Sequence, residues 1–125
     1  IIEKVLEGRG LIFQMNTLGG MINSEEFTAD SCFPYRNAVF LSELQCYWEN
    51  EKNSNERIQQ FQDVQSIFLK AGLTRQYVNY PALENENYES AYYGGNVDRL
   101  KKLKTKYDPA NLFSHPQSIK GHKQT

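Results

Sequence analysis

The sequence of 125 residues has little cysteine, no recognisable metal motif and no long apolar run. Its two cysteines, Cys32 and Cys46, are too few for a disulfide scaffold and lack Cys-x-x-Cys spacing. We expect two small buried or half-buried side chains, with a bridge between them as the alternative. His115 and His122 have no cysteine or acidic partners at ligand spacing, so we expect no metal.

The chain also has almost no net charge. Fourteen Lys and Arg face fifteen Asp and Glu, for a formal charge of −1, which argues against a nucleic-acid binder. No apolar run approaches the ~18 residues of a membrane span, so we expect no membrane contact. Because the chain begins at Ile1 without Met or a leader peptide, we expect a piece of a longer protein.

Aromatic residues are plentiful at 13%, and the apolar residues follow two periods. Alternation predicts a strand over 11–16 and a longer strand over 38–48. On the longer strand, Glu43 and Gln45 share the less apolar face. In an ordinary antiparallel sheet such a mixed face is simply the solvent face.

Steps of three and four residues predict a helix over 54–72, capped by Ser54 or Asn55 and ended by Gly72. A second helix is predicted over 96–106, with Asn96 as its N-cap. Its expected buried stripe is Val97, Leu100, Leu103 and Tyr107. Residues 76–81 are predicted to be extended, 82–91 to be an acidic loop, and Leu112-Phe113 to pack back on the second helix. The predicted fold is α+β, an antiparallel sheet covered by helices.

Several motifs occur in order in the C-terminal third. They are Tyr77-Val78-Asn79-Tyr80, Tyr92-Tyr93-Gly94-Gly95-Asn96, the stretch from Lys104 to Phe113, and Gln117-Ser118-Ile119. This series resembles the C-terminal end of the berberine-bridge-enzyme-like FAD-linked oxidases, which are vanillyl-alcohol-oxidase-type flavoproteins. Residues 13–16 and 33–37 are similar to the substrate domain of that family. The resemblance therefore covers about residues 11–119.

The resemblance implies residues 1–74 as the end of a substrate-binding domain, 75–119 as the family's C-terminal segment, and 120–125 as a flexible tail. It implies FAD as cofactor, held mainly by an N-terminal domain that this chain lacks. The implied reaction oxidises an alcohol, a sugar or an activated C–H bond by hydride transfer to the flavin. The fragment alone would then be inactive, with exposed apolar surface that favours self-association. The alternative is a non-catalytic binding module on the same scaffold.

The resemblance also implies roles for individual residues. Tyr77 matches a tyrosine that serves as base in several sugar and alcohol oxidases, although it also has an alternative interpretation as a core tyrosine with a bonded hydroxyl. The implied flavin contacts are Asn79 and Asn96. The implied substrate contacts are Gln14, Asn16 and Gln45.

Two positions depart from the family pattern. Some members carry an assisting carboxylate where this chain has Asn16, which cannot accept a proton. The longer strand usually carries Gln where this chain has Glu43. A carboxylate there is a second candidate base or a site for a cationic substrate; the alternative is a side chain that simply faces solvent.

Overall fold

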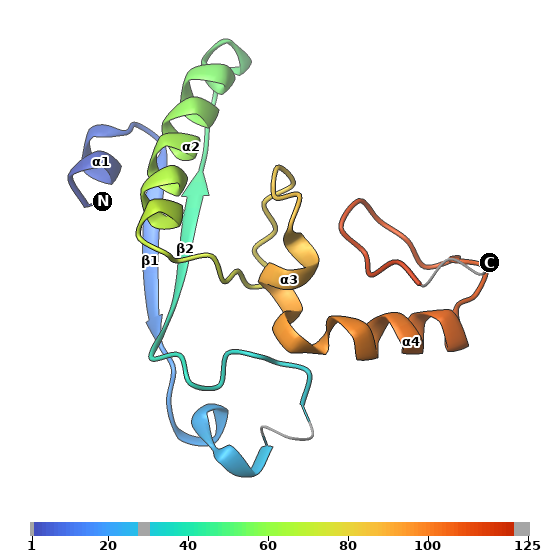
Figure 1. Ribbon diagram of the computed structural model, residues 1–125. Coiled ribbons are helices and arrows are strands. Elements are labelled where there is room, and N and C mark those ends of the chain that lie inside the picture. Colours follow the sequence, from blue (N-terminus) through green and yellow to red (C-terminus); the bar gives the residue numbers. More distant parts are fainter. Residues whose placement is uncertain (1, 28–30, 122–125) are drawn as a thin grey trace. The chain divides into compact units, whose positions relative to one another are not determined.

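The computed structural model describes residues 2–27 and 31–121 (Figure 1). They form two compact units. The sheet unit comprises Ile1–Asn23 and Asn37–Thr74, and the helical unit comprises Ser24–Arg36 and Arg75–Thr125. The chain therefore passes from one unit to the other three times.

Two antiparallel strands form the sheet unit's centre, β1 (Leu11–Thr17) and β2 (Phe40–Cys46). Main-chain bonds from Leu18 N to Val39 O (2.8 Å) and from Tyr47 N to Gly10 O (2.9 Å) continue the pairing at both ends. The paired length therefore approaches that of the predicted strand over 38–48. The predicted α+β class with an antiparallel sheet is confirmed.

Helix α2 (Ser54–Lys70) packs on one face of this sheet, as Figure 1 shows. The rings of Phe13 and Phe68 lie 5.5 Å apart between centroids, and Val64 is only 1% exposed. Phe13 shares its face of the sheet with Leu44 and Cys46, as the period of two requires. The apolar stripe of the sequence is therefore the contact between helix and sheet.

The ends of α2 are formed differently from one another. Gly72 follows the helix with φ of 80°, the left-handed conformation expected of a residue that ends a helix. At the other end Asn53 is the N-cap and its side chain makes no capping bond. Ser54 instead donates to the Glu51 carbonyl (2.7 Å), within the short 3₁₀ helix η3 (Glu51–Asn53) that precedes α2. The prediction that Ser54 or Asn55 caps the helix was wrong, because η3 already brings Ser54 into a helical conformation.

Both cysteines are free thiols. Cys46 is half-buried, as predicted, and its Sγ donates to the Arg57 carbonyl at 3.3 Å. Burial raises the pKa of this thiol, against the opposing charge of Arg57. Cys32 is exposed, so the prediction of a buried or half-buried side chain was wrong for it. It lies in the helical unit, where the sequence showed no periodic pattern.

Two further helical segments of the sheet unit were not predicted. Helix α1 (Ile2–Glu7) precedes β1, and the 3₁₀ helix η1 (Gly20–Asn23) follows it. Within residues 2–27 and 31–121, no helix combines the length and the apolar composition needed to cross a bilayer.

Two glycines with nearly equal dihedrals predict different effects of the same substitution. Gly10 has φ of 78° and Gly72 has φ of 80°. A Cβ on Gly10 would lie 2.2 Å from the Tyr47 carbonyl oxygen, whereas a Cβ on Gly72 would meet nothing within 4 Å. We expect Gly72→Ala to cost about 1–2 kcal/mol for the left-handed backbone. Gly10→Ala should cost about 1–3 kcal/mol more, because its methyl group must displace main chain. Urea unfolding of both variants measures the difference, and equal midpoints would contradict it.

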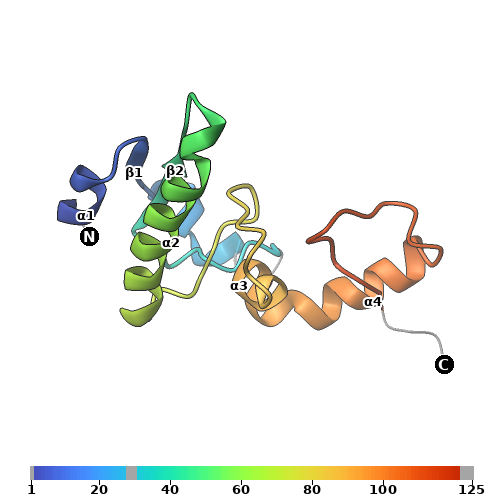
Figure 2. The ribbon, with the colours of Figure 1, turned by 90° about the horizontal axis from the view of Figure 1, so that it is seen from above.

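The helical unit contains α3 (Tyr88–Tyr93), the 3₁₀ helix η4 (Gly94–Asn96), η2 (Glu25–Phe27) and α4 (Val97–Tyr107). Figure 2 shows α3 leading through η4 into α4. The predicted loop over 82–91 was thus wrong at its end, which is helical. The predicted extended segment over 76–81 contains a turn, closed by Tyr80 N and Tyr77 O at 2.9 Å.

Tyr92 is the buried centre of the helical unit, with 3% of its surface exposed. Its hydroxyl donates to Gln117 Oε1 (2.7 Å) and accepts from Ala82 N (3.4 Å). Gln117, which is 5% exposed, also donates from Nε2 to the Ala82 carbonyl at 2.8 Å. The loop around residue 82 and the segment after α4 are therefore both fixed to α3.

The predicted buried stripe of α4 is half right. Val97 and Leu100 are half-buried, but Leu103 is 42% and Tyr107 is 72% exposed. The amphipathic pattern locates a helix correctly, but it does not show which neighbour covers each turn.

Candidate functional site

Four polar residues implied by the resemblance share one face of the sheet. The register places Gln14 opposite Glu43, and it places Gln45 opposite Ile12 and Asn16 opposite Leu41. Cross-strand partners point to the same side of a sheet, so all four point away from the face that packs on α2. The period of two predicted which of these residues share a face within each strand, and the pairing of the two strands brings the two faces to one side. We call the face formed by Ile12, Gln14, Asn16, Leu41, Glu43 and Gln45 the polar sheet face.

The side-chain amides of Gln14 and Gln45 on this face form hydrogen bonds with neighbouring side chains, whereas the Glu43 carboxylate does not. Gln14 Nε2 donates to Asn16 Oδ1 at 3.2 Å, and the Tyr47 hydroxyl donates to Gln45 Oε1 at 2.8 Å. Glu43 is half-buried between them. Its side chain has no hydrogen bond or ion pair with any residue in 2–27 or 31–121. The face therefore presents oriented amides around an unpaired acceptor.

A second group of predicted residues is formed in the helical unit. Asn79 Nδ2 donates to the Tyr77 hydroxyl oxygen at 2.8 Å. The Tyr77 ring packs edge-on against Phe33 and Tyr80, with centroids 6.4 Å and 5.3 Å away. The turn at 78–79 brings the two side chains together. Since the Tyr77 oxygen accepts this bond, its own hydrogen is left to point elsewhere.

Asn96 holds the loop before β2 in place. Its Nδ2 donates to the Cys32 carbonyl at 3.2 Å, and a Cβ on Gly94 would lie 3.4 Å from Pro34. Asn96 is the N-cap of α4 by position, as predicted, but its side chain makes no capping bond. Its amide group is used by the chain's own backbone, which is a structural role that the sequence did not indicate.

The same loop contributes an aromatic cluster that the sequence analysis did not single out. Phe33 and Tyr35 pack edge-on at 5.8 Å, and the guanidinium of Arg75 lies 5.8 Å from the Tyr35 ring. Burial raises the pKa of the Tyr35 hydroxyl, outweighing a Gln76 main-chain group and the Arg75 charge, which act in the opposite direction. The rings of Tyr35 and Tyr77 both pack edge-on against Phe33. The sequence feature that could have predicted this cluster is the pair of aromatic residues on either side of Pro34.

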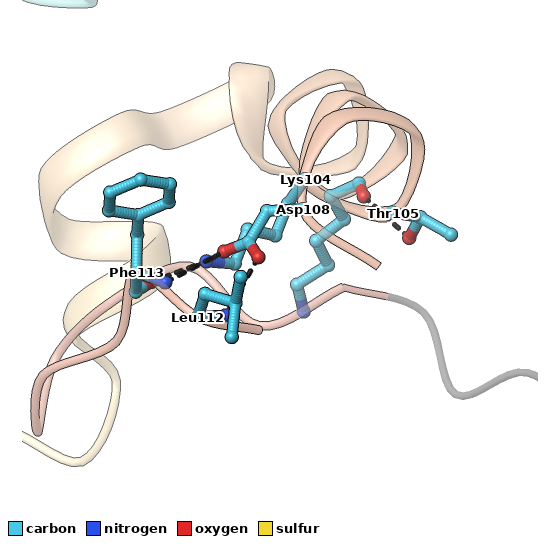
Figure 3. Close-up of polar contacts among 6 residues, drawn as sticks. Lys104, Thr105, Asp108, Leu112 and Phe113 are labelled. Atoms are coloured by element: carbon cyan, nitrogen blue, oxygen red, sulfur yellow. Dashed lines mark hydrogen bonds and ion pairs between the residues drawn. The ribbon is translucent and has the colours of Figure 1, made fainter. Parts of the chain in front are cut away.

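The end of α4 is closed by a carboxylate (Figure 3). Asp108 accepts from Leu112 N at 2.7 Å and from Phe113 N at 3.1 Å, and the Lys104 ammonium donates to it and to the Phe113 carbonyl. The hydrogen bond from Lys104 holds the pKa of Asp108 below its usual range. Leu112 and Phe113 are 80% and 82% exposed. Their main chain, not their side chains, packs back on the helix, which corrects the prediction.

A pocket of about 720 Å³ lies beside α3 and α4 in the helical unit. An ion pair between Lys101 and Glu89, with 2.6 Å between Nζ and Oε2, forms part of its wall. The positive charge of Lys101 is therefore already compensated. Across residues 2–27 and 31–121, no three His, Cys, Asp or Glu side chains gather closely enough to bind a metal.

Comparison with known proteins adds independent evidence. Residues 76–120 match the family model described as berberine and berberine like. The chain is 33% identical over 90 residues to the uncharacterized FAD-linked oxidoreductase YvdP of Bacillus subtilis, which covers 72% of the chain and 20% of YvdP. It is 49% identical over 57 residues to the chitooligosaccharide oxidase of Gibberella zeae, covering 44% of the chain and 12% of that protein.

A solved structure agrees with this match. Wild-type BBE-like 1 from Physcomitrella patens superposes with a TM-score of 0.83 at 26% identity, covering 94% of the chain and 25% of that structure. The chain thus spans about a fifth to a quarter of the length of YvdP and of this structure.

Proposed function

Since this chain belongs to the berberine-bridge-enzyme-like family of FAD-linked oxidoreductases, we propose that it forms the substrate-facing part of an FAD-dependent oxidase. The family is enzymatic and FAD is its cofactor. The proposal for the whole protein is supported by relatives named as FAD-linked oxidoreductase and oxidase and by the polar sheet face, which carries side chains suited to a polar ligand.

The proposed reaction is oxidation of a hydroxyl group on a small molecule, with a sugar as the substrate class. The relative named chitooligosaccharide oxidase supports the class. The observation that carries the reaction is the hydrogen bond between Asn79 and the Tyr77 hydroxyl, which lies within the segment that matches the family model.

Tyr77 is the proposed base. In this role its oxygen accepts the hydroxyl proton of the substrate, while the N–H of Asn79 holds that oxygen in place. Packing against Phe33 and Tyr80 restricts the ring, so the oxygen has a defined position. Gln14 and Gln45 offer amide groups to substrate hydroxyls. FAD, when bound, supplies the acceptor for the hydride.

The described residues fit one end of FAD rather than the whole cofactor. Asn79 is exposed, and its Oδ1 remains an acceptor suited to a ring N–H. Asn96 donates from Nδ2 to the Cys32 carbonyl, and its Oδ1 likewise remains an acceptor. Lys101 and Lys104 are paired with carboxylates, so neither charge is available to a pyrophosphate. These two lysines are therefore not the proposed partners of the phosphate end of FAD.

The visible absorption spectrum of the full-length protein, expressed from its gene, tests this function. We expect a flavin spectrum, recorded before and after acid precipitation to separate covalent from non-covalent flavin. Loss of the flavin spectrum on adding a sugar without oxygen would identify a substrate. A folded, colourless protein would contradict the oxidase function and leave a binding module on the same scaffold.

A further inference from the structure

We propose that Glu43 selects substrates that carry a positive charge, so that among sugars the protein prefers one with an ammonium group over its neutral N-acetylated counterpart. This inference rests on the proposed oxidase function and adds the chemistry of its substrate. It concerns the polar sheet face alone.

Glu43 lies in the middle of that face with polar but uncharged neighbours. Gln14 is its cross-strand partner, and Gln45 is next on the same side of β2. Every other member of the polar sheet face is neutral. The ion pairs of the sheet unit do not involve Glu43. Lys4 pairs with Glu7, and Arg57 pairs with Glu56.

The partial burial of Glu43 makes its carboxylate favour a positively charged ligand. A half-buried carboxylate has lost part of its hydration, so a group that compensates the charge is favoured and a second negative charge is repelled. The side chain has no hydrogen bond or ion pair in the described part of the chain that would already fulfil that need. An ammonium group supplies both the charge and up to three N–H donors.

The surrounding amides suit the remainder of a sugar. Gln14 and Gln45 are fixed by Asn16 and Tyr47, and each keeps part of its amide group for substrate hydroxyls. The face therefore combines one charged site with neutral hydrogen-bonding groups on both sides. This arrangement fits a polyhydroxylated cation better than a purely neutral sugar.

The test compares chito-oligosaccharides with their de-N-acetylated forms of equal length, using the full-length flavin-loaded protein and its Glu43→Gln variant. We expect kcat/KM of the wild-type protein to favour the amine-bearing sugar. Glu43→Gln should lower that ratio about tenfold, the effect of losing one charge-assisted contact. Glu49→Gln is the matched control, because Glu49 is an exposed carboxylate outside the strand.

A second measurement does not depend on turnover of a sugar. Sulfite is an anion that adds to the flavin of many oxidases and bleaches it. In the proposed function the polar sheet face binds the substrate that reduces the flavin, so the dissociation constant of sulfite reports the charge on that face. We expect Glu43→Gln to bind sulfite about tenfold more tightly than the wild-type protein, and Glu49→Gln to match the wild type.

The outcomes separate three explanations. An equal sugar ratio and equal sulfite affinity in the wild type and Glu43→Gln would overturn the inference. An equal fall in kcat for both sugars would also overturn it and assign Glu43 as the base. If neither sugar is oxidised, the sulfite constants alone decide. A wild-type protein without flavin would contradict the proposed function itself.

Discussion

Replacing Tyr77 with phenylalanine should lower the rate of substrate oxidation by the full-length protein about 100- to 10,000-fold, the usual contribution of a general base. The substitution removes the one oxygen that Asn79 holds and leaves the ring to pack against Phe33 and Tyr80. Flavin content and stability should therefore stay close to those of the wild type. Anaerobic stopped-flow reduction of the flavin measures the effect without interference from reoxidation.

Two companion variants make this result specific. Tyr107→Phe is the control, because Tyr107 is 72% exposed on α4 and its ring can remain in place. Asn79→Ala keeps the Tyr77 hydroxyl and removes the N–H that donates to it, so we expect a smaller loss of rate than in Tyr77→Phe. Rapid reduction of the flavin in Tyr77→Phe would show that Tyr77 is a packing residue and that the base is another group.

The second large effect concerns stability. Tyr92→Phe removes a buried hydroxyl that serves both Gln117 Oε1 and Ala82 N, and leaving these groups unsatisfied should cost about 1–3 kcal/mol. Tyr92→Ala also removes the ring and should cost about 3–5 kcal/mol. Urea unfolding followed by far-ultraviolet circular dichroism measures both values.

The burial of Tyr92 gives this prediction a clear control. Tyr107→Phe changes an exposed hydroxyl of the same unit and should leave the free energy of unfolding nearly unchanged. If Tyr92→Phe were as stable as the wild type, the hydrogen bonds to Gln117 and Ala82 would not be what fixes the neighbouring loops. Gln117→Ala should then also leave the free energy of unfolding unchanged.

The sequence was most informative where its pattern is local. Alternation within 11–16 and 38–48 located both strands, and it placed Glu43 and Gln45 on one face of the second strand. Steps of three and four residues likewise located α2, with Gly72 at its end. These features follow from neighbours a few residues apart, so one sequence contains them.

Features that depend on distant residues were missed. Helix α3 lies in a stretch whose acidic composition predicts a loop, and it is held by Tyr92 contacting a glutamine 25 positions away. Asn96 has the composition of a helix cap, but its side chain binds a carbonyl 64 positions earlier. No periodicity encodes such pairs. Tyr77 and Asn79 are close in sequence, but their spacing predicts a shared side and not the hydrogen bond between them, which forms at a turn.

The assignment of residues 24–36 to the helical unit has a consequence for synthesis of the chain. Cys32 leaves the ribosome long before Asn96, its partner 64 residues later. At a synthesis rate of 5–20 residues per second, Asn96 is added roughly 3 to 13 seconds after Cys32, so the loop lacks this hydrogen bond for that time. During that interval Phe33 also lacks Tyr77, and an aromatic segment is exposed between two strands that are ready to pair. Slow translation of residues 37–96 therefore lengthens the period in which a chaperone is most useful to this chain.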